Sequence, residues 1–160
     1  MRIEQRQPTQ QLGLDDDLLD RVFAARGISD PSQLERGLVN LLSPADLPEI
    51  DIAAARLADA VEQNQKILIV GDFDADGATS VALCLLALRA MGAVNVDFLV
   101  PNRFDYGYGL SPEIVQLAAT LAPNVIVTVD NGVASVDGVA LANEAGIDVV
   151  VTDHHLPGDV

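Results

Sequence analysis

The sequence has a single cysteine and no long apolar run, and each shortage excludes a class of protein. The cysteine, Cys84, lies in the apolar segment VALCLLAL, so an internal disulfide is excluded and a core position is expected. No apolar stretch reaches the roughly 18 residues that a membrane-spanning helix needs, and the start, MRIEQRQPTQQLG, does not resemble a signal peptide. We therefore expect a soluble, cytoplasmic protein without a membrane partner.

Basic residues are also scarce. The 160 residues include 9 lysines and arginines against 24 aspartates and glutamates, which gives a formal net charge of -15. A free-standing nucleic-acid-binding protein usually presents a basic surface. The charge therefore indicates either a substrate that is not a polyanion or a source of neutralisation, such as bound divalent cations or a separate basic domain.

What the sequence does contain, from residue 63 onward, is a regular alternation of strand-like and helix-like segments. The strand-like runs are 66–70, 96–100, 125–129 and 148–152, and the helix-like runs are 79–91, 111–121 and 135–145. Near-continuous valine, isoleucine and leucine strands separated by helices predict an α/β fold, a parallel sheet with helices on both faces. Ser111-Pro112-Glu113 is a typical helix start, and Gly92 and Gly146 are typical helix ends.

The first 62 residues have a different pattern. Segments 14–26 and 50–64 are helix-like, and Pro31, Pro44 and Pro48 interrupt the connections between them. We interpret the acidic run at 15–17 as a helix start and not as a metal site. The expected organisation is a helical extension, 1–62, followed by the α/β domain, 63–160.

Three of the four strand-like runs end in acidic residues. The clusters are Asp72, Asp74 and Asp76 after the first run, Asp130 after the third, and Asp153, His154 and His155 after the fourth. A parallel sheet brings these loops to its carboxyl edge, where ligands bind. Carboxylates gathered there repel one another unless cations lie between them. Taken alone, Asp130 before Asn-Gly would be an ordinary turn residue.

The ligand types indicate a hard or borderline ion, manganese or magnesium, because carboxylates dominate and no thiolate is near. Asp74 and Asp76 can each face a different ion while Asp130 bridges two, an arrangement suited to hydrolysis of phosphate esters. Two other motifs fit less well. An EF-hand loop starting at Asp72 would have Leu83 where its last acid belongs, and a haloacid-dehalogenase nucleophile at Asp74 would leave the Asp-His-His cluster unexplained.

Three segments together, VGDFDADGATS, VTVDNG and VTDHHLPG, resemble the first three motifs of the DHH phosphoesterases. The segment 100–113, VPNRFDYGYGLSPE, is similar to the RecJ-type exonucleases of that family, as are ARGI and LERGLVNLL in the helical extension. The resemblance implies 5′-3′ exonuclease activity on single-stranded DNA in recombination and repair, with two manganese or magnesium ions. It also implies single-strand-binding protein and a helicase as candidate partners.

The resemblance assigns roles to individual residues. The implied metal ligands are Asp72, Asp74, Asp76, Asp130 and His154, with Asp72 either a ligand or an acid just behind the ligands. His155 would contact the scissile phosphate and Asp153 would orient its neighbours, so that catalysis would depend on His155, Asp130 and Asp153. Arg103 is a candidate phosphate clamp, because a guanidinium pairs bidentately with phosphate oxygens, and Tyr108 beside it is a candidate substrate contact.

The family has a fourth motif with a further metal-binding aspartate, which this sequence does not contain. We therefore expect an N-terminal part of a longer enzyme, with weakened metal binding when it is alone. Two alternatives stay open: a DHH phosphoesterase acting on short oligonucleotides, cyclic dinucleotides or pyrophosphate, and an inactive DHH domain that serves as a binding module. The segment 100–113 argues against the first, and the intact ligand set argues against the second.

Overall fold

The chain divides into two compact units, Met1–Pro48 and Glu49–Val160, in a computed structural model that describes residues 7–8 and 10–158. The first unit contains α1, Asp17–Ala24, and three short 3₁₀ helices, Pro31–Leu34, Leu38–Asn40 and Pro44–Asp46. The acidic run does start a helix, because the Asp16 carboxylate accepts the N–H groups of Leu18 and Leu19. Residues 1–6 and 9 of the predicted extension lie outside the described part.

The second unit is built on a four-stranded parallel sheet with the order β2-β1-β3-β4. Its strands are β1, Ile67–Gly71, β2, Val96–Leu99, β3, Val125–Val129, and β4, Asp148–Thr152. In the register, Ile69 pairs with Phe98 of β2 and with Val127 of β3, which in turn pairs with Val150 of β4. The predicted parallel sheet is confirmed.

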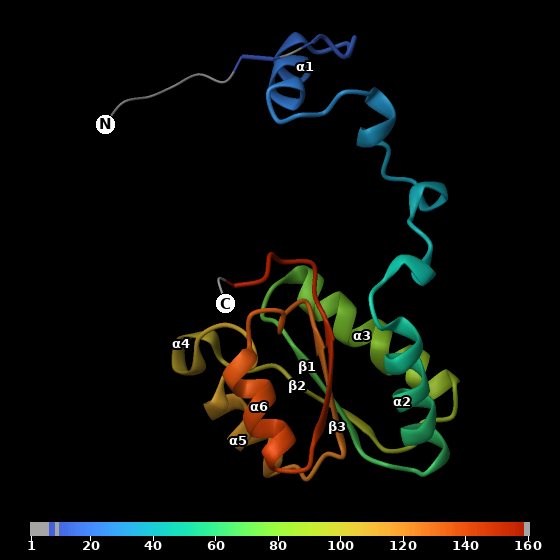
Figure 1. Ribbon diagram of the computed structural model, residues 1–160, viewed down its shortest axis with the longest axis vertical. Helices are drawn as coiled ribbons and strands as arrows, with labels where there is room; N and C mark the ends of the chain where they lie inside the picture. Colours follow the sequence, from blue (N-terminus) through green and yellow to red (C-terminus); the bar gives the residue numbers. More distant parts are fainter. Residues whose placement is uncertain (1–6, 9, 159–160) are drawn as a thin grey trace. The chain divides into compact units, whose positions relative to one another are not determined.

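Helices cover both faces of this sheet (Figure 1). On one face, α2, Ile50–Glu62, and α3, Ala75–Ala90, pack on the odd-numbered side chains of β1 and β3, and on the other α5, Pro112–Ala119, and α6, Val136–Glu144, pack on the even-numbered ones. The short α4, Arg103–Tyr106, follows β2. Because β1 and β3 are buried on both faces, these two central strands are almost entirely apolar, as the sequence predicted. The outer strands β2 and β4 are partly exposed, and each contains an aspartate.

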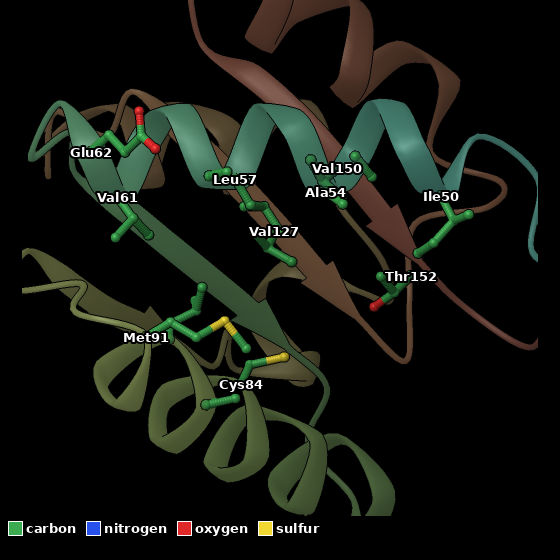
Figure 2. Close-up of a pocket in the computed structure, with 14 residues that line it drawn as sticks. Ile50, Ala54, Leu57, Val61, Glu62, Cys84, Met91, Val127, Val150 and Thr152 are labelled. Atoms are coloured by element: carbon green, nitrogen blue, oxygen red, sulfur yellow. The ribbon is translucent and has the colours of Figure 1, made fainter. Parts of the chain in front are cut away.

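An apolar cavity of about 530 Å³ lies between α2, α3 and the sheet. Figure 2 shows Cys84 of α3 and Met91, which directly follows α3, facing Leu57 and Val61 of α2 across it. Cys84 packs against the core but stays partly exposed. Within the described part of the chain, no helix combines the length and the apolar character needed to cross a bilayer.

Candidate metal centre

The acidic loops meet between two neighbouring strands whose following helices lie on opposite faces of the sheet. The chain leaves β1 through α3 toward β2 and leaves β3 through α6 toward β4, so the two neighbouring strands β1 and β3 send their connections to opposite faces. Such a point opens a crevice beyond the carboxyl ends of the strands. The sequence predicted that three loops meet at this edge, and the structure brings them together there: oxygen and nitrogen atoms from all three loops lie close to one another.

The loop after β1 runs directly into a helix. Asp74 is the N-cap of α3, and its Oδ1 accepts the N–H of Gly77 at 3.2 Å. This bond is the main cause that lowers the pKa of Asp74. A Cβ at Gly77 would lie 2.6 Å from the Asp72 carbonyl oxygen, so only glycine lets the first turn approach the strand end. Asp76 therefore lies in the first turn of α3, and not in a loop as expected.

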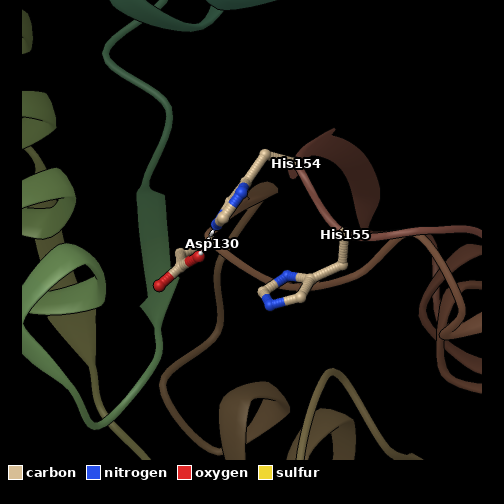
Figure 3. Close-up of side chains that lie close together, drawn as sticks. All are labelled: Asp130, His154 and His155. Carbon is tan, nitrogen blue, oxygen red and sulfur yellow. Dashed lines mark hydrogen bonds and ion pairs between the residues drawn. The ribbon is translucent and has the colours of Figure 1, made fainter. Parts of the chain in front are cut away.

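Asp130 sits at the centre of the site. Its backbone adopts a left-handed φ of 62°, and its N–H donates to the Thr152 carbonyl at 3.0 Å, which ties the end of β3 to the end of β4. Its Oδ1 lies 2.9 Å from His154 Nε2 (Figure 3). Burial is the main cause that raises the pKa of Asp130. The buried Oδ2 has no hydrogen-bond partner among the described residues.

Two groups of potential ligands share this aspartate. Oxygens of Asp72, Asp74 and Asp130 lie within 4.8 Å of one another, and so do ligand atoms of Asp130, His154 and His155. The unpartnered Oδ2 of Asp130 and the crowded carboxylates fit divalent cations, and the oxygen and imidazole donor set suits manganese or magnesium. Asp76 is in neither group; its Oδ2 lies 3.8 Å from His154 Nε2.

His155 is held by a buried carboxylate and a phenol. The Asp153 side chain is 1% exposed, and its Oδ1 lies 2.7 Å from His155 Nδ1. The Tyr108 hydroxyl donates to the Asp130 carbonyl at 3.0 Å and lies 2.9 Å from the same Nδ1. The Asp153 bond is the main cause that raises the pKa of His155. Because both contacts use Nδ1, Nε2 is the ring nitrogen left to face a ligand.

The Asp153 carboxylate also organises the backbone around it. It accepts the N–H groups of Val133 at 3.0 Å, of His154 at 2.7 Å and of His155 at 3.0 Å. These bonds fix the turn that follows β4 against the loop that follows β3. The arrangement fits the orienting role that the resemblance implied for Asp153.

Arg103 lies inside the acidic cluster. Its guanidinium forms an ion pair with Asp72, lies 3.7 Å from Asp74 Oδ2, and is 5.5 Å from the centre of the Tyr108 ring. Asn102 starts α4 by accepting the Phe104 N–H at 3.0 Å, which presents Arg103 at the first position of the helix. The sequence prediction of an arginine beside the phosphate site is consistent with this position, and its contact with substrate stays a prediction.

Sequence reasoning did not single out Asn131. This residue is 2% exposed, and its side-chain amide donates to the carbonyl oxygens of Val70 and Val129 at 3.1 and 2.9 Å. The only signal for it was the Asp-Asn-Gly sequence, which by itself is typical of a turn.

A parallel α/β sheet with carboxylates and imidazoles gathered at its switch point defines a candidate metal-binding phosphoesterase domain. Residues 66–160 match the model of the DHH family, N-terminal domain. The chain therefore belongs to the DHH family.

The curated relatives are single-stranded-DNA-specific exonucleases named RecJ. The Haemophilus influenzae protein is 54% identical over 140 residues, which are 88% of this chain and 24% of that protein. The Dickeya dadantii protein is 54% identical over 157 residues, 96% of this chain and 27% of that protein. The chain thus spans about a quarter of the length of the relatives it matches.

Two solved structures share the fold. A crystal structure of the exonuclease RecJ bound to manganese superposes with a TM-score of 0.67 at 37% identity, covering 75% of this chain and 31% of that one. RecJ from Thermus thermophilus in complex with Mn²⁺ gives a TM-score of 0.63 at 32% identity, covering 86% of this chain and 19% of that one. Both structures contain manganese, the ion that the donor set here would suit.

Proposed function

We propose that the carboxyl edge of this sheet binds two divalent cations, manganese or magnesium, and hydrolyses phosphodiester bonds at the 5′ end of single-stranded DNA. The observation that carries the proposal is Asp130, which belongs to both groups of potential ligands and has an unpartnered buried oxygen. A carboxylate shared by two ligand groups can hold two ions close together, as the two-ion mechanism of phosphoester hydrolysis needs.

The proposed ligands come from three loops. Asp72, Asp74 and Asp130 form one group, and Asp130 with His154 belongs to the other; Asp76 completes the set from the first turn of α3. Bound ions would activate the attacking water and stabilise charge on the phosphate oxygens. Arg103 contributes a positive charge at the same place, and guanidinium geometry suits a phosphate oxygen pair.

His155 is proposed to contact the scissile phosphate through Nε2. Asp153 fixes the ring through Nδ1 at 2.7 Å and favours the protonated imidazole, which can donate to a phosphate oxygen or to the leaving oxygen. The Tyr108 hydroxyl lies 2.9 Å from the same Nδ1 and also donates to the Asp130 carbonyl, which ties the ring to the backbone of Asp130. Asp153 and Tyr108 thus hold His155, the proposed proton donor, beside the metal ligands.

Single-stranded DNA is the proposed substrate because the relatives at 54% identity are named for it. A role in recombination and repair and a 5′-3′ direction belong to the same proposal. The domain division at residues 62 and 63 stays a prediction: the family match begins at residue 66, and the compact units divide between residues 48 and 49, which places α2 with the sheet. The cytoplasmic location and the partners, single-strand-binding protein and a helicase, stay predictions.

Calorimetric titration with manganese tests the site. The wild-type chain should bind the ion, and Asp130→Ala should lose most of that binding, whereas Asp97→Ala on the exposed part of β2 should not. Equal binding by wild type and Asp130→Ala would refute the metal centre. Release of mononucleotides from 5′-ended single strands, compared with cleavage of cyclic dinucleotides and pyrophosphate, then distinguishes the exonuclease from the small-substrate alternative.

A further inference from the structure

Asn131 joins the two strands that carry the metal-binding loops. Its amide nitrogen donates to Val70 of β1 and to Val129 of β3, residues that lie 61 and 2 positions away in the chain. The parallel ladder between these strands ends at the pair Gly71 and Val129. The Asn131 side chain therefore bridges the strands at the point where their backbone pairing stops.

The bridge lies at the carboxyl end of the two strands, where their paired residues end. Beyond the last pair, the chain turns from β1 into α3 on one face and from β3 toward α6 on the other. Asp74 follows the first strand and Asp130 the second, and oxygens of both lie within 4.8 Å of one another. Two ligands of one ion have to stay close together. A side chain that holds the two strand ends together also limits the separation of these carboxylates.

The orientation of the amide is fixed by its partners. Both are carbonyl oxygens, so the NH₂ group must face them, and Oδ1 must point elsewhere. That oxygen is buried and has no hydrogen-bond partner among the described residues. A buried acceptor without a partner lowers stability, and such costs occur mainly at functional sites. The two donated hydrogen bonds therefore explain why an asparagine occupies this position, because its unpartnered oxygen does not stabilise the core.

We propose that Asn131 is a positioning residue: by tying the end of β1 to the end of β3, it sets the spacing between Asp74 and Asp130 and thereby the affinity for manganese. The inference rests on the proposed metal site. Asn131 is proposed to touch neither the ion nor the substrate. It acts through the ligands Asp74 and Asp130, whose positions it fixes.

The chain offers a matched control at the other end of the same two strands. Asn124, just before β3, accepts the Lys66 N–H through its Oδ1 at 2.9 Å, and Lys66 directly precedes β1. Asn124→Ala therefore removes a side-chain tie between β1 and β3 far from the acidic loops. This control is more exposed than Asn131, so folding of each variant is measured separately by circular dichroism during thermal unfolding.

The experiment is manganese calorimetry on wild type, Asn131→Ala, Asn131→Ser and Asn124→Ala. For folded Asn131→Ala we expect a dissociation constant raised about 10- to 100-fold, the usual effect of losing a residue that supports metal ligands. Asn131→Ser keeps one donor and should lie between it and wild type, and Asn124→Ala should match wild type.

Three results would overturn the inference. One is a wild-type dissociation constant for folded Asn131→Ala, and another is an equal loss of affinity in Asn124→Ala. The third is failure of both Asn131 variants to fold while Asn124→Ala folds, because the role would then be structural. Absence of manganese binding by the wild-type chain would instead refute the proposed metal site itself.

Discussion

Replacing Asp153 by asparagine tests how the Asp-His-His segment is held together. The buried carboxylate accepts four hydrogen bonds, three on Oδ1 and one, from the Val133 N–H, on Oδ2. An asparagine oxygen can replace Oδ1, but its NH₂ group then meets the N–H of Val133. An orphaned buried donor costs about 1–3 kcal/mol, and loss of the charge roughly halves the strength of the other bonds.

We expect Asp153→Asn to lower the free energy of unfolding by about 2–4 kcal/mol, measured by urea denaturation monitored with circular dichroism. The control is Asp97→Asn, where an exposed carboxylate accepts, among the described residues, only the Phe98 N–H at 2.9 Å, and where a change within about 0.5 kcal/mol is expected. A loss below about 1 kcal/mol for Asp153→Asn would show that the four hydrogen bonds do not stabilise the protein as argued, since one buried donor without an acceptor should alone cost that much.

The same variant has a pH signature. Burial acts to raise the pKa of Asp153, but the N–H groups of Val133 and His155 outweigh it and the pKa is lowered. A folded pKa below the unfolded one means that the stabilisation is present at neutral pH and is lost as the pH falls below the ordinary aspartate range. Wild type should therefore lose more stability in acid than Asp153→Asn, and parallel pH profiles would contradict this. In the variant, the pKa of His155 should fall, which NMR titration of the ion-free protein measures.

The remaining predictions concern other parts of the molecule. Gly138→Ala on α6 would place a Cβ 1.7 Å from the Leu110 carbonyl oxygen, so the helix must shift; we expect a loss of about 1–3 kcal/mol in thermal unfolding, and an unchanged melting temperature would be inconsistent with this packing. The N–H of Leu12 is the main cause that lowers the pKa of Asp20, so its stabilisation should be lost in acid; the protection of the Leu12 amide against hydrogen exchange, relative to its intrinsic rate at each pH, should fall as the pH falls and should be low at every pH in Asp20→Asn. Burial raises the pKa of Tyr108 to about 12; an ultraviolet absorbance titration should show one late ionisation that disappears in Tyr108→Phe, and an ordinary phenol titration would count against its buried contacts.

The strands and their order along the chain follow from the sequence, because apolar runs of valine, isoleucine and leucine bounded by polar turns have few other solutions. The bounds of β3 and β4 agree with the predicted runs 125–129 and 148–152. The start of α3 was less predictable. It begins at Ala75 and not at Thr79, since the Asp74 carboxylate caps the helix inside the segment interpreted as an acidic loop.

The sequence by itself determined which residue types follow which strands, and a parallel sheet then requires those residues to share one edge. Only the tertiary structure decided which side chains meet there. Arg103 pairs with Asp72 across 31 positions, and Tyr108 reaches His155 across 47. No local pattern encodes such contacts, because they depend on how loops leave the sheet and on which polar atoms burial leaves without a partner.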